Sequence, residues 1–198
     1  MFATVHTYCM TGDRQRWNEK FLAGEAQSPE PDPLLPEVCS ALPAGRALDL
    51  AGGAGRHAIW LAQRGWHVRL TDVSDQGLAI AAARAAEARV SLEIRRESAA
   101  DSLHASIQSG EKFDLIAVFW FLVREHFAAL PALLAPGGVV LMKTFTAENA
   151  RFAGGTPPRF ALHPRELRDA FAALDPTDKD LFLTYLKASR IEDAHPTL

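Results

Sequence analysis

The chain has 198 residues, of which 48% are hydrophobic and 23% are charged, as in an ordinary globular protein. A formal net charge of −3 argues against a general nucleic-acid-binding surface. The longest apolar run, Leu115 to Val123, is too short to cross a bilayer, and no signal peptide opens the chain. Cys9 and Cys39 are too few for a disulfide framework and lack metal-ligand spacing. We therefore expect a cytoplasmic protein, monomer or homodimer, without a nucleic-acid, membrane or metal partner.

The N-terminal 36 residues are predicted to be a helix and a linker, and residues 37–198 to be one ligand-binding domain. Asp13 to Phe21 has the pattern of a short helix with Asp13 as its N-cap. Trp17 and Phe21 are four residues apart and share a face, which indicates either a docked helix or a lid over a ligand. Residues 27–36 contain four prolines, so we expect a linker outside the core.

From Arg46 onward, predicted strands and helices alternate. Strands are expected near residues 46–50, 66–71, 90–95, 113–119, 139–145 and 181–185. Helices are expected near residues 55–64, 74–88, 98–110, 120–135 and 164–174. Ser74 is a predicted N-cap, and Ser98 with Asp101 resembles a capping box. This alternation predicts a mostly parallel sheet between two layers of helices, which is a three-layer αβα Rossmann-like α/β fold.

Residues 47–58, with the sequence ALDLAGGAGRHA, are the expected ligand site. A short apolar strand leads into a turn of small residues, and a helical pattern begins at Arg56. Glycines allow a sharp turn and the close approach of a ligand, so a strand, a glycine turn and a helix N-terminus form a nucleotide-binding corner. Asp49 lies within the strand, where a buried carboxylate is costly unless it binds a donor or a cation.

Two families have such a corner. Gly53, Gly55 and Ala58 fit the dinucleotide pattern GxGxxG/A, typical of an NAD-dependent oxidoreductase. The longer string LDLAGGAGR resembles motif I of class I S-adenosylmethionine-dependent methyltransferases, with Ala51 in place of the usual first glycine. That resemblance implies that Asp49 serves the cationic methionine end of the cofactor, and Asp49 therefore favours the methyltransferase. Alanine at position 51 is a small change if its φ is negative and a strained one otherwise.

Later motifs extend the resemblance over roughly residues 13–190. Residues 113–122 resemble the methyltransferase strand-four motif, and LAPGG at residues 134–138 resembles the turn before strand five. Residues 121–171 look like small bacterial methyltransferases related to the tellurite-resistance type. The resemblance implies methyl transfer from S-adenosylmethionine to a small-molecule acceptor by direct displacement, leaving S-adenosylhomocysteine. Such chemistry depends mainly on positioning, and no catalytic residue is assigned. A non-catalytic nucleotide-binding protein is the third alternative, to which Ala51 gives some weight.

The end of the sheet is expected to be incomplete. Class I methyltransferases usually close with an antiparallel strand seven, but only thirteen residues follow Tyr185 and none forms a clear apolar run. We therefore expect strand seven to be missing, which leaves six parallel strands or fewer and an exposed edge.

Asp72 ends the second predicted strand, where a carboxylate can accept both ribose hydroxyls of a nucleoside or can interact with the helix dipole. Arg124 matches an arginine of the family and is a candidate for an anionic acceptor, with a solvated helix-start arginine as the alternative. His126 is interpreted as a helix-surface residue rather than a base, and His57 as a surface or satisfied core histidine rather than a cofactor contact. The predicted cofactor contacts are Trp17, Asp49, Ala51, Gly52, Gly53, Gly55, Asp72, Val73, Ser98, Ala99 and Phe119. The predicted acceptor contacts are Phe21, Trp120 and Arg124.

Overall fold

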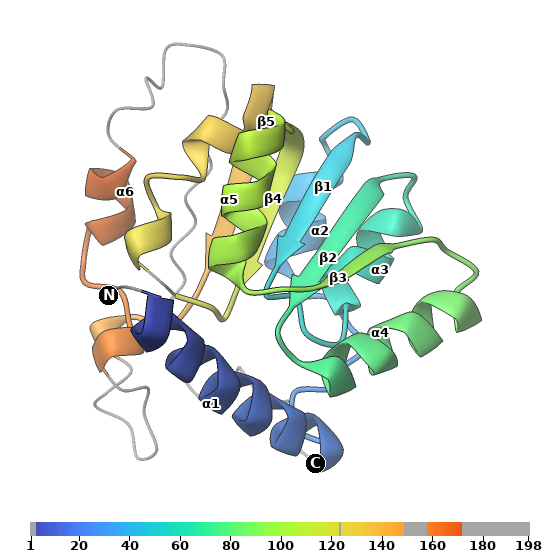
Figure 1. Cartoon of the computed structure of the whole chain (residues 1–198). Coiled ribbons are helices and arrows are strands. Elements are labelled where there is room, and N and C mark those ends of the chain that lie inside the picture. The colour runs from blue at the N-terminus through green and yellow to red at the C-terminus, as the bar shows by residue number, and fades with distance from the viewer. Residues whose placement is uncertain (1–2, 123, 149–157, 172–198) are drawn as a thin grey trace.

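The computed structural model describes residues 3–122, 124–148 and 158–171 (Figure 1). Within them, one parallel sheet has the strand order β3-β2-β1-β4-β5. Its strands are β1 (Arg46–Leu50), β2 (His67–Asp72), β3 (Glu93–Arg96), β4 (Phe113–Phe119) and β5 (Leu134–Lys143). The helices are α1 (Ala3–Leu22), α2 (Leu34–Cys39), α3 (Arg56–Ala62), α4 (Asp75–Glu87), α5 (Ala99–Ser109) and α6 (Glu166–Ala170). The predicted Rossmann-like α/β fold is confirmed.

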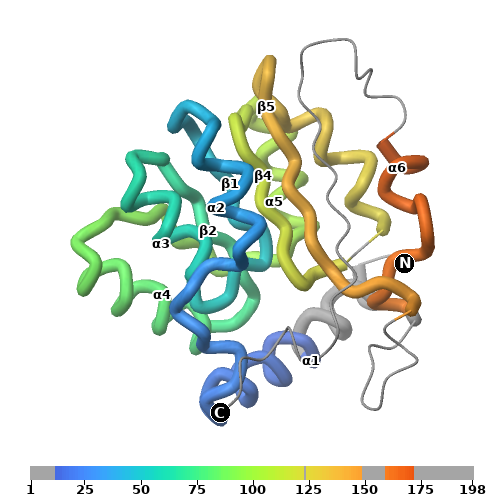
Figure 2. Tube along the Cα trace, turned by 180° about the vertical axis from the view of Figure 1, so that it is seen from behind, coloured from blue at the N-terminus to red at the C-terminus, as the bar shows by residue number. Residues whose placement is uncertain are grey.

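Two hydrophobic cores lie on opposite faces of the sheet, because successive side chains of a strand point in opposite directions. In β1, Ala47 belongs to the core covered by α2, α3 and α4, whereas Leu48 and Leu50 belong to the core covered by α5 and α6. Figures 1 and 2 show the sheet between these layers, with α1 crossing its lower edge beside α4. No helix among the described residues has the length and hydrophobicity needed to cross a membrane.

The two predicted serine caps are confirmed. Ser74 Oγ accepts a hydrogen bond from the Gly77 N–H at 3.0 Å, and Ser98 Oγ accepts one from the Asp101 N–H at 3.0 Å. Each bond satisfies a backbone donor that has no partner within its own helix. The caps fix where α4 and α5 begin, shortly after the ends of β2 and β3.

The N-terminal region differs from expectation in two ways. Helix α1 begins at Ala3, so Asp13 lies inside it and is not an N-cap. The proline-rich stretch is not a linker throughout, because Leu34 and Leu35 start α2 and are buried in the core. Pro36 falls in the first turn of α2, where a missing N–H breaks no intrahelical hydrogen bond.

The segment after β4 is also different, because the helix expected up to residue 135 is absent from the described residues. The chain forms two short 3₁₀ turns instead, at Arg124–His126 and Pro131–Leu133. Trp120 turns the chain with a φ of 60°, and Pro131 lacks the N–H that a longer helix needs. Strand β5 then starts earlier than expected, with a register shift opposite β4 that absorbs residues 136–138.

The C-terminal expectations are only partly covered by the structure. Helix α6 begins at Glu166, close to the predicted start near Pro164. The predicted strand at residues 181–185 and the missing strand seven lie outside the described residues.

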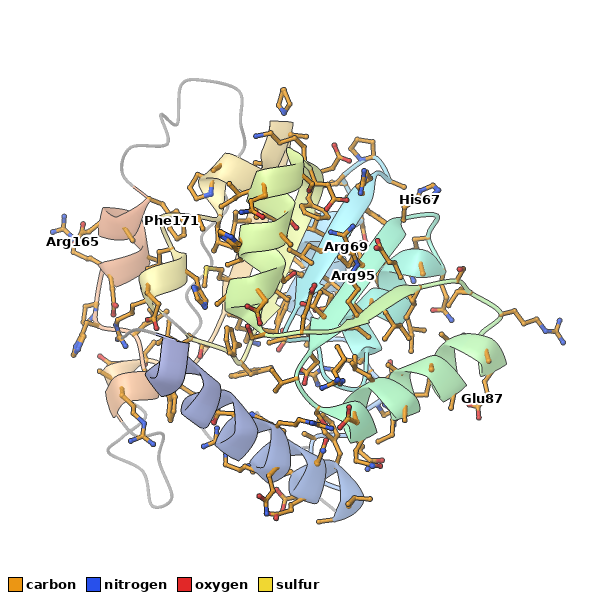
Figure 3. All side chains as sticks on the ribbon, in the orientation of Figure 1. His67, Arg69, Glu87, Arg95, Arg165 and Phe171 are labelled. Atoms are coloured by element: carbon orange, nitrogen blue, oxygen red, sulfur yellow. The ribbon has the colours of Figure 1, made fainter. Side chains whose placement is uncertain are left out.

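Arg69 of β2 joins several elements on the α5 side of the sheet (Figure 3). Its side chain is 3% exposed and donates to Glu93 at 2.9 Å and to Glu111 at 2.6 and 2.7 Å. The hydrogen bonds from Arg69 hold the pKa of Glu111 at about 2, well below its usual range. This buried guanidinium therefore ties β2 to β3 and to the turn between α5 and β4.

Candidate functional site

The predicted corner lies between the end of β1 and the start of α3. Gly52 N–H donates to the Thr71 carbonyl at 3.1 Å, which holds the turn against β2. A Cβ at Gly52 would lie 2.5 Å from Cγ of Asp49, so only glycine fits there. Gly53 and Gly55 have φ values of 56° and 75°, in the left-handed region that favours glycine. The glycines are therefore required by the shape of the turn itself.

Ala51 is the strained residue of this turn, because its φ is 56°. A left-handed conformation costs a non-glycine residue about 1–2 kcal/mol, and glycine loses about 0.5–1 kcal/mol more on folding than alanine. We therefore expect Ala51→Gly to raise the free energy of unfolding by about 0.5–1 kcal/mol. Urea unfolding measures this change. The same substitution at exposed Ala82 in α4 is the control and should destabilise by about 1 kcal/mol. A lower free energy of unfolding for Ala51→Gly than for wild type would contradict the inference that Ala51 is strained.

Asp49 is the deepest charged group of the corner, with 1% of the residue exposed. Its Oδ2 accepts a hydrogen bond from the Ala58 N–H at 3.1 Å. Its Oδ1 is buried and has no hydrogen-bond partner anywhere in the described parts of the chain. Burial raises the pKa of Asp49 to about 7, although the Ala58 N–H and the charge of Arg56 favour the ionised form. An unsatisfied buried carboxylate oxygen is suited to a donor or cation supplied by a ligand.

Asp72 closes the other side of the corner at the end of β2. Its Oδ2 accepts from the Gly53 N–H at 2.9 Å and its Oδ1 from the Ser74 N–H at 2.8 Å. Burial raises the pKa of Asp72, and the Ser74, Gly53 and Val73 N–H groups oppose that rise. Each carboxylate oxygen has a second lone pair, so both can accept further hydrogen bonds from a ligand.

Helix α1 packs directly on this corner. Phe21 is 5% exposed, and a Cβ at Gly53 or Gly77 would lie within 3 Å of its ring. The Trp17 ring centroid is 6.2 Å from that of Phe21, and Trp17 is half-buried. The contacts of Phe21 fit the docked-helix interpretation. Three expectations remain predictions. They are that Phe21 contacts the acceptor, that Trp17 contacts the cofactor, and that α1 acts as a lid.

An aromatic wall lies at the carboxyl end of β4. Phe119 stacks on His57 with ring centroids 4.1 Å apart, and the Trp120 ring lies 4.9 Å from that of Phe145. His57 is buried, and its Nε2 accepts a hydrogen bond from the Asp32 N–H at 3.2 Å. Burial lowers the pKa of His57 well below its usual range, so the ring is neutral. His57 is therefore a core histidine, as interpreted from the sequence.

A buried ion pair beside this wall was not predicted. Lys143 Nζ, at the end of β5, lies 2.8 Å from both carboxylate oxygens of Asp32, and the two side chains are 8% and 5% exposed. Lys143 Nζ also lies 5.1 Å from the centroid of the Trp120 ring. The sequence offered one signal for Lys143, because a lysine at the end of an apolar strand can be buried and then needs a partner. Asp32 had no such signal, because it stands in the proline-rich stretch.

The other predicted contact residues lie on two separate segments, with Ser98 and Ala99 at the start of α5 and Arg124 in the 3₁₀ turn after β4. Ser98 caps α5, and Ala99 is the first residue of that helix. The preceding Glu97 N–H donates to the Asp72 carbonyl at 3.1 Å, which brings Ser98 and Ala99 near β2.

Arg124 is not a solvated helix-start residue. Its guanidinium pairs with Glu166 and donates to the carbonyls of residues 159 and 161. Both the adenine role of the α5 start and the acceptor role of Arg124 remain predictions.

No group of three or more metal-ligating side chains is found in the described portions of the chain. The corner is therefore a site of backbone amides and carboxylates, which can hold an organic ligand carrying hydroxyl and cationic groups.

Comparison with known families identifies the segment that builds this corner. The family described as "Methyltransferase domain" matches residues 47–138, from β1 to the start of β5. These residues therefore match a methyltransferase domain. The predicted resemblance to methyltransferases is thereby confirmed, and the dinucleotide pattern at Gly53 belongs to this domain. None of the curated proteins matches the chain.

The methyltransferase domain and its flanking elements are similar in fold to several solved structures. TehB from Haemophilus influenzae is 18% identical, with a TM-score of 0.61 over 78% of this chain and 55% of that one. Two methyltransferases described as S-adenosylmethionine-dependent, from Geobacter sulfurreducens and Thiobacillus denitrificans, are each 23% identical with a TM-score of 0.57. The matches cover 80% and 78% of this chain and 70% and 68% of theirs, respectively, and both structures contain S-adenosyl-L-homocysteine. The chain thus spans about half the length of TehB.

Proposed function

We propose that the chain binds S-adenosylmethionine in this corner and transfers its methyl group to a small-molecule acceptor. The observation that carries the proposal is the buried Oδ1 of Asp49, which has no partner among the described residues and lies beside the glycine turn of a methyltransferase domain. A methionine ammonium supplies the donor that this oxygen lacks. The structures with bound S-adenosyl-L-homocysteine support the same class of ligand.

Each part of the corner has a separate role in this proposal. Asp49 binds the ammonium, Asp72 accepts the ribose hydroxyls, and the Gly52 backbone allows the ligand to approach closely. Ser98 and Ala99 lie toward the adenine. When bound, S-adenosylmethionine supplies an electrophilic methyl group on a sulfonium cation. In this proposal Phe119 contacts the cofactor and Trp120 the acceptor, at the carboxyl end of β4.

The chain contributes positioning rather than a general base. His57 is neutral, but its Nε2 is already engaged by the Asp32 N–H, and its ring is stacked on Phe119. An acceptor that is already a thiolate, carboxylate or other oxyanion needs no base for displacement at the methyl carbon. Alignment of such a nucleophile with the methyl group accounts for most of the rate. We further propose a cytoplasmic location for this reaction.

A screen of product formation tests the proposal. Purified protein with S-adenosylmethionine is incubated separately with thiols, chalcogen oxyanions, amines and carboxylic acids, and S-adenosylhomocysteine is quantified. We expect one acceptor class to give product well above the acceptor-free control. Tight cofactor binding without turnover on any class would favour the non-catalytic alternative. Tight NAD binding by the same protein would favour the oxidoreductase.

A further inference from the structure

A chain of hydrogen bonds runs from α1 to the ribose carboxylate. Asn18 Oδ1 accepts from the Ser74 hydroxyl at 2.6 Å and from the Gln76 N–H at 3.2 Å. Ser74 in turn donates its N–H to Asp72 Oδ1 at 2.8 Å. Asn18 therefore reaches the carboxylate through a single intervening residue. Figures 1 and 2 both show α1 lying beside α4, where these bonds form.

The polar contacts of this face of α1 converge on one place. Arg14 pairs with Asp75, and Asn18 Nδ2 lies 3.5 Å from Oδ2 of the same aspartate. All of these partners belong to residues 74–76, directly after Asp72. Docking of α1 does not depend on them alone, because Phe21 already buries its ring against Gly53 and Gly77. The polar contacts thus constrain residues 74–76 in addition to the docking that Phe21 provides.

We propose that Asn18 is a positioning residue for the ribose of the cofactor. By accepting from Ser74 and Gln76, Asn18 fixes the turn that orients the carboxylate of Asp72, whose free lone pairs then point to the ribose hydroxyls. The ribose subsite is in this way completed by the N-terminal helix, outside the methyltransferase domain of residues 47–138. The inference rests on the proposed function, because it presumes a nucleoside ligand at Asp72.

The test compares two ligands that differ only in the ribose hydroxyls. S-adenosylhomocysteine and its 2′,3′-dideoxy analogue are titrated calorimetrically into wild type and Asn18→Leu. We expect the substitution to weaken S-adenosylhomocysteine by about tenfold and the dideoxy analogue by less than about twofold. The matched control is Gln15→Leu, which changes the same chemical group on the exposed side of α1, where Gln15 donates to Glu19 at 2.9 Å. Both ligands should bind this control as they bind wild type.

A second pair of variants keeps the test independent of folding defects. Asn18→Asp retains an acceptor oxygen for Ser74 and Gln76. Its second oxygen faces Asp75, but Arg14 and Arg96 pair with that aspartate and offset the added charge, so affinity is expected to stay within about threefold of wild type. Should Asn18→Leu not fold, Asn18→Ala removes the same acceptor oxygen with a smaller side chain and should show the same difference between ligands. Equal losses for both ligands, or no loss for either, would overturn the inference while leaving the proposed function standing. Absence of S-adenosylhomocysteine binding to wild type would overturn both.

Discussion

Replacing Asp49 with asparagine is expected to weaken S-adenosylhomocysteine binding by roughly ten- to a hundredfold at pH 8. The reason is that a lost charge-assisted contact costs on the order of 1.5–3 kcal/mol. Asparagine keeps the size of the side chain and an oxygen that can accept from the Ala58 N–H, so the turn should stay in place. Calorimetric titration of wild type and variant measures the ratio of dissociation constants.

The matched control is Asp114→Asn. Asp114 also accepts a backbone hydrogen bond, from the Arg46 N–H at 2.7 Å, but it lies at the opposite end of the strands. Its substitution should leave S-adenosylhomocysteine affinity unchanged. Wild type should bind NAD at least about tenfold more weakly than S-adenosylhomocysteine, because Asp49 repels a pyrophosphate. An Asp49→Asn variant that binds like wild type would remove the main support for the cofactor assignment.

The same carboxylate predicts how binding depends on pH. The pKa of Asp49 is raised to about 7 by burial, and a ligand ammonium binds only its ionised form. Affinity of wild type should therefore be constant above pH 7 and fall about tenfold per unit below it.

The free energy of unfolding changes with pH in the opposite direction to the affinity. A folded-state pKa above the unfolded value of 3.8 favours the protonated, folded form. That stability is lost as the pH rises through about 7, so Asp49→Asn should be the more stable protein at pH 8 and lose this advantage near pH 4.

Replacing Lys143 with methionine is expected to lower the free energy of unfolding by about 3–5 kcal/mol. The substitution leaves the carboxylate of Asp32 buried without its cation, and an uncompensated buried charge is strongly unfavourable. Urea unfolding measures the effect. The double variant Asp32→Asn with Lys143→Met should recover most of the loss, because no buried charge remains and the asparagine oxygen can still accept from the Leu34 N–H.

Arg16→Met provides the comparison for an exposed pair. Arg16 bonds Asp13 one turn away on α1, and these side chains are 47% and 48% exposed. Its loss should change stability by less than about 0.5 kcal/mol, since solvent screens such pairs. A similarly small change for Lys143→Met would show that the Asp32 pair is open to solvent. A double variant as unstable as the single one would show that Lys143 acts through packing.

Features encoded by neighbouring residues were predictable from the sequence. Strand β4 was located correctly because an apolar run of its length is typical of a strand buried on both faces. The caps of α4 and α5 were recognised because a serine before a helix satisfies backbone donors within the next three residues. The corner followed from the same kind of local pattern, since Asp49, Gly52 and Gly53 are nearly contiguous.

The features that were missed depend on residues far apart in the chain. Asp32 and Lys143 are 111 residues apart, and Asn18 and Ser74 are 56 apart. A single sequence carries no periodic pattern for such pairs, because their proximity is decided by the packing of whole elements. The helix wrongly expected after β4 has a different cause. Its apolar residues have helical spacing, but Pro131 and the left-handed Trp120 prevent the backbone from following it.

The buried position of Arg69 predicts how natural substitutions at this residue affect the protein. Its guanidinium network with Glu93 and Glu111 lies among the strands and touches none of the corner residues. Substitutions of Arg69 remove the buried guanidinium that ties β2 to Glu93 and Glu111, so they reduce the fraction of molecules that fold. Inherited changes at Arg69 should therefore alter how much protein accumulates in a cell, whereas the turnover of each folded molecule stays the same. Such a variant would behave as a change of gene dosage.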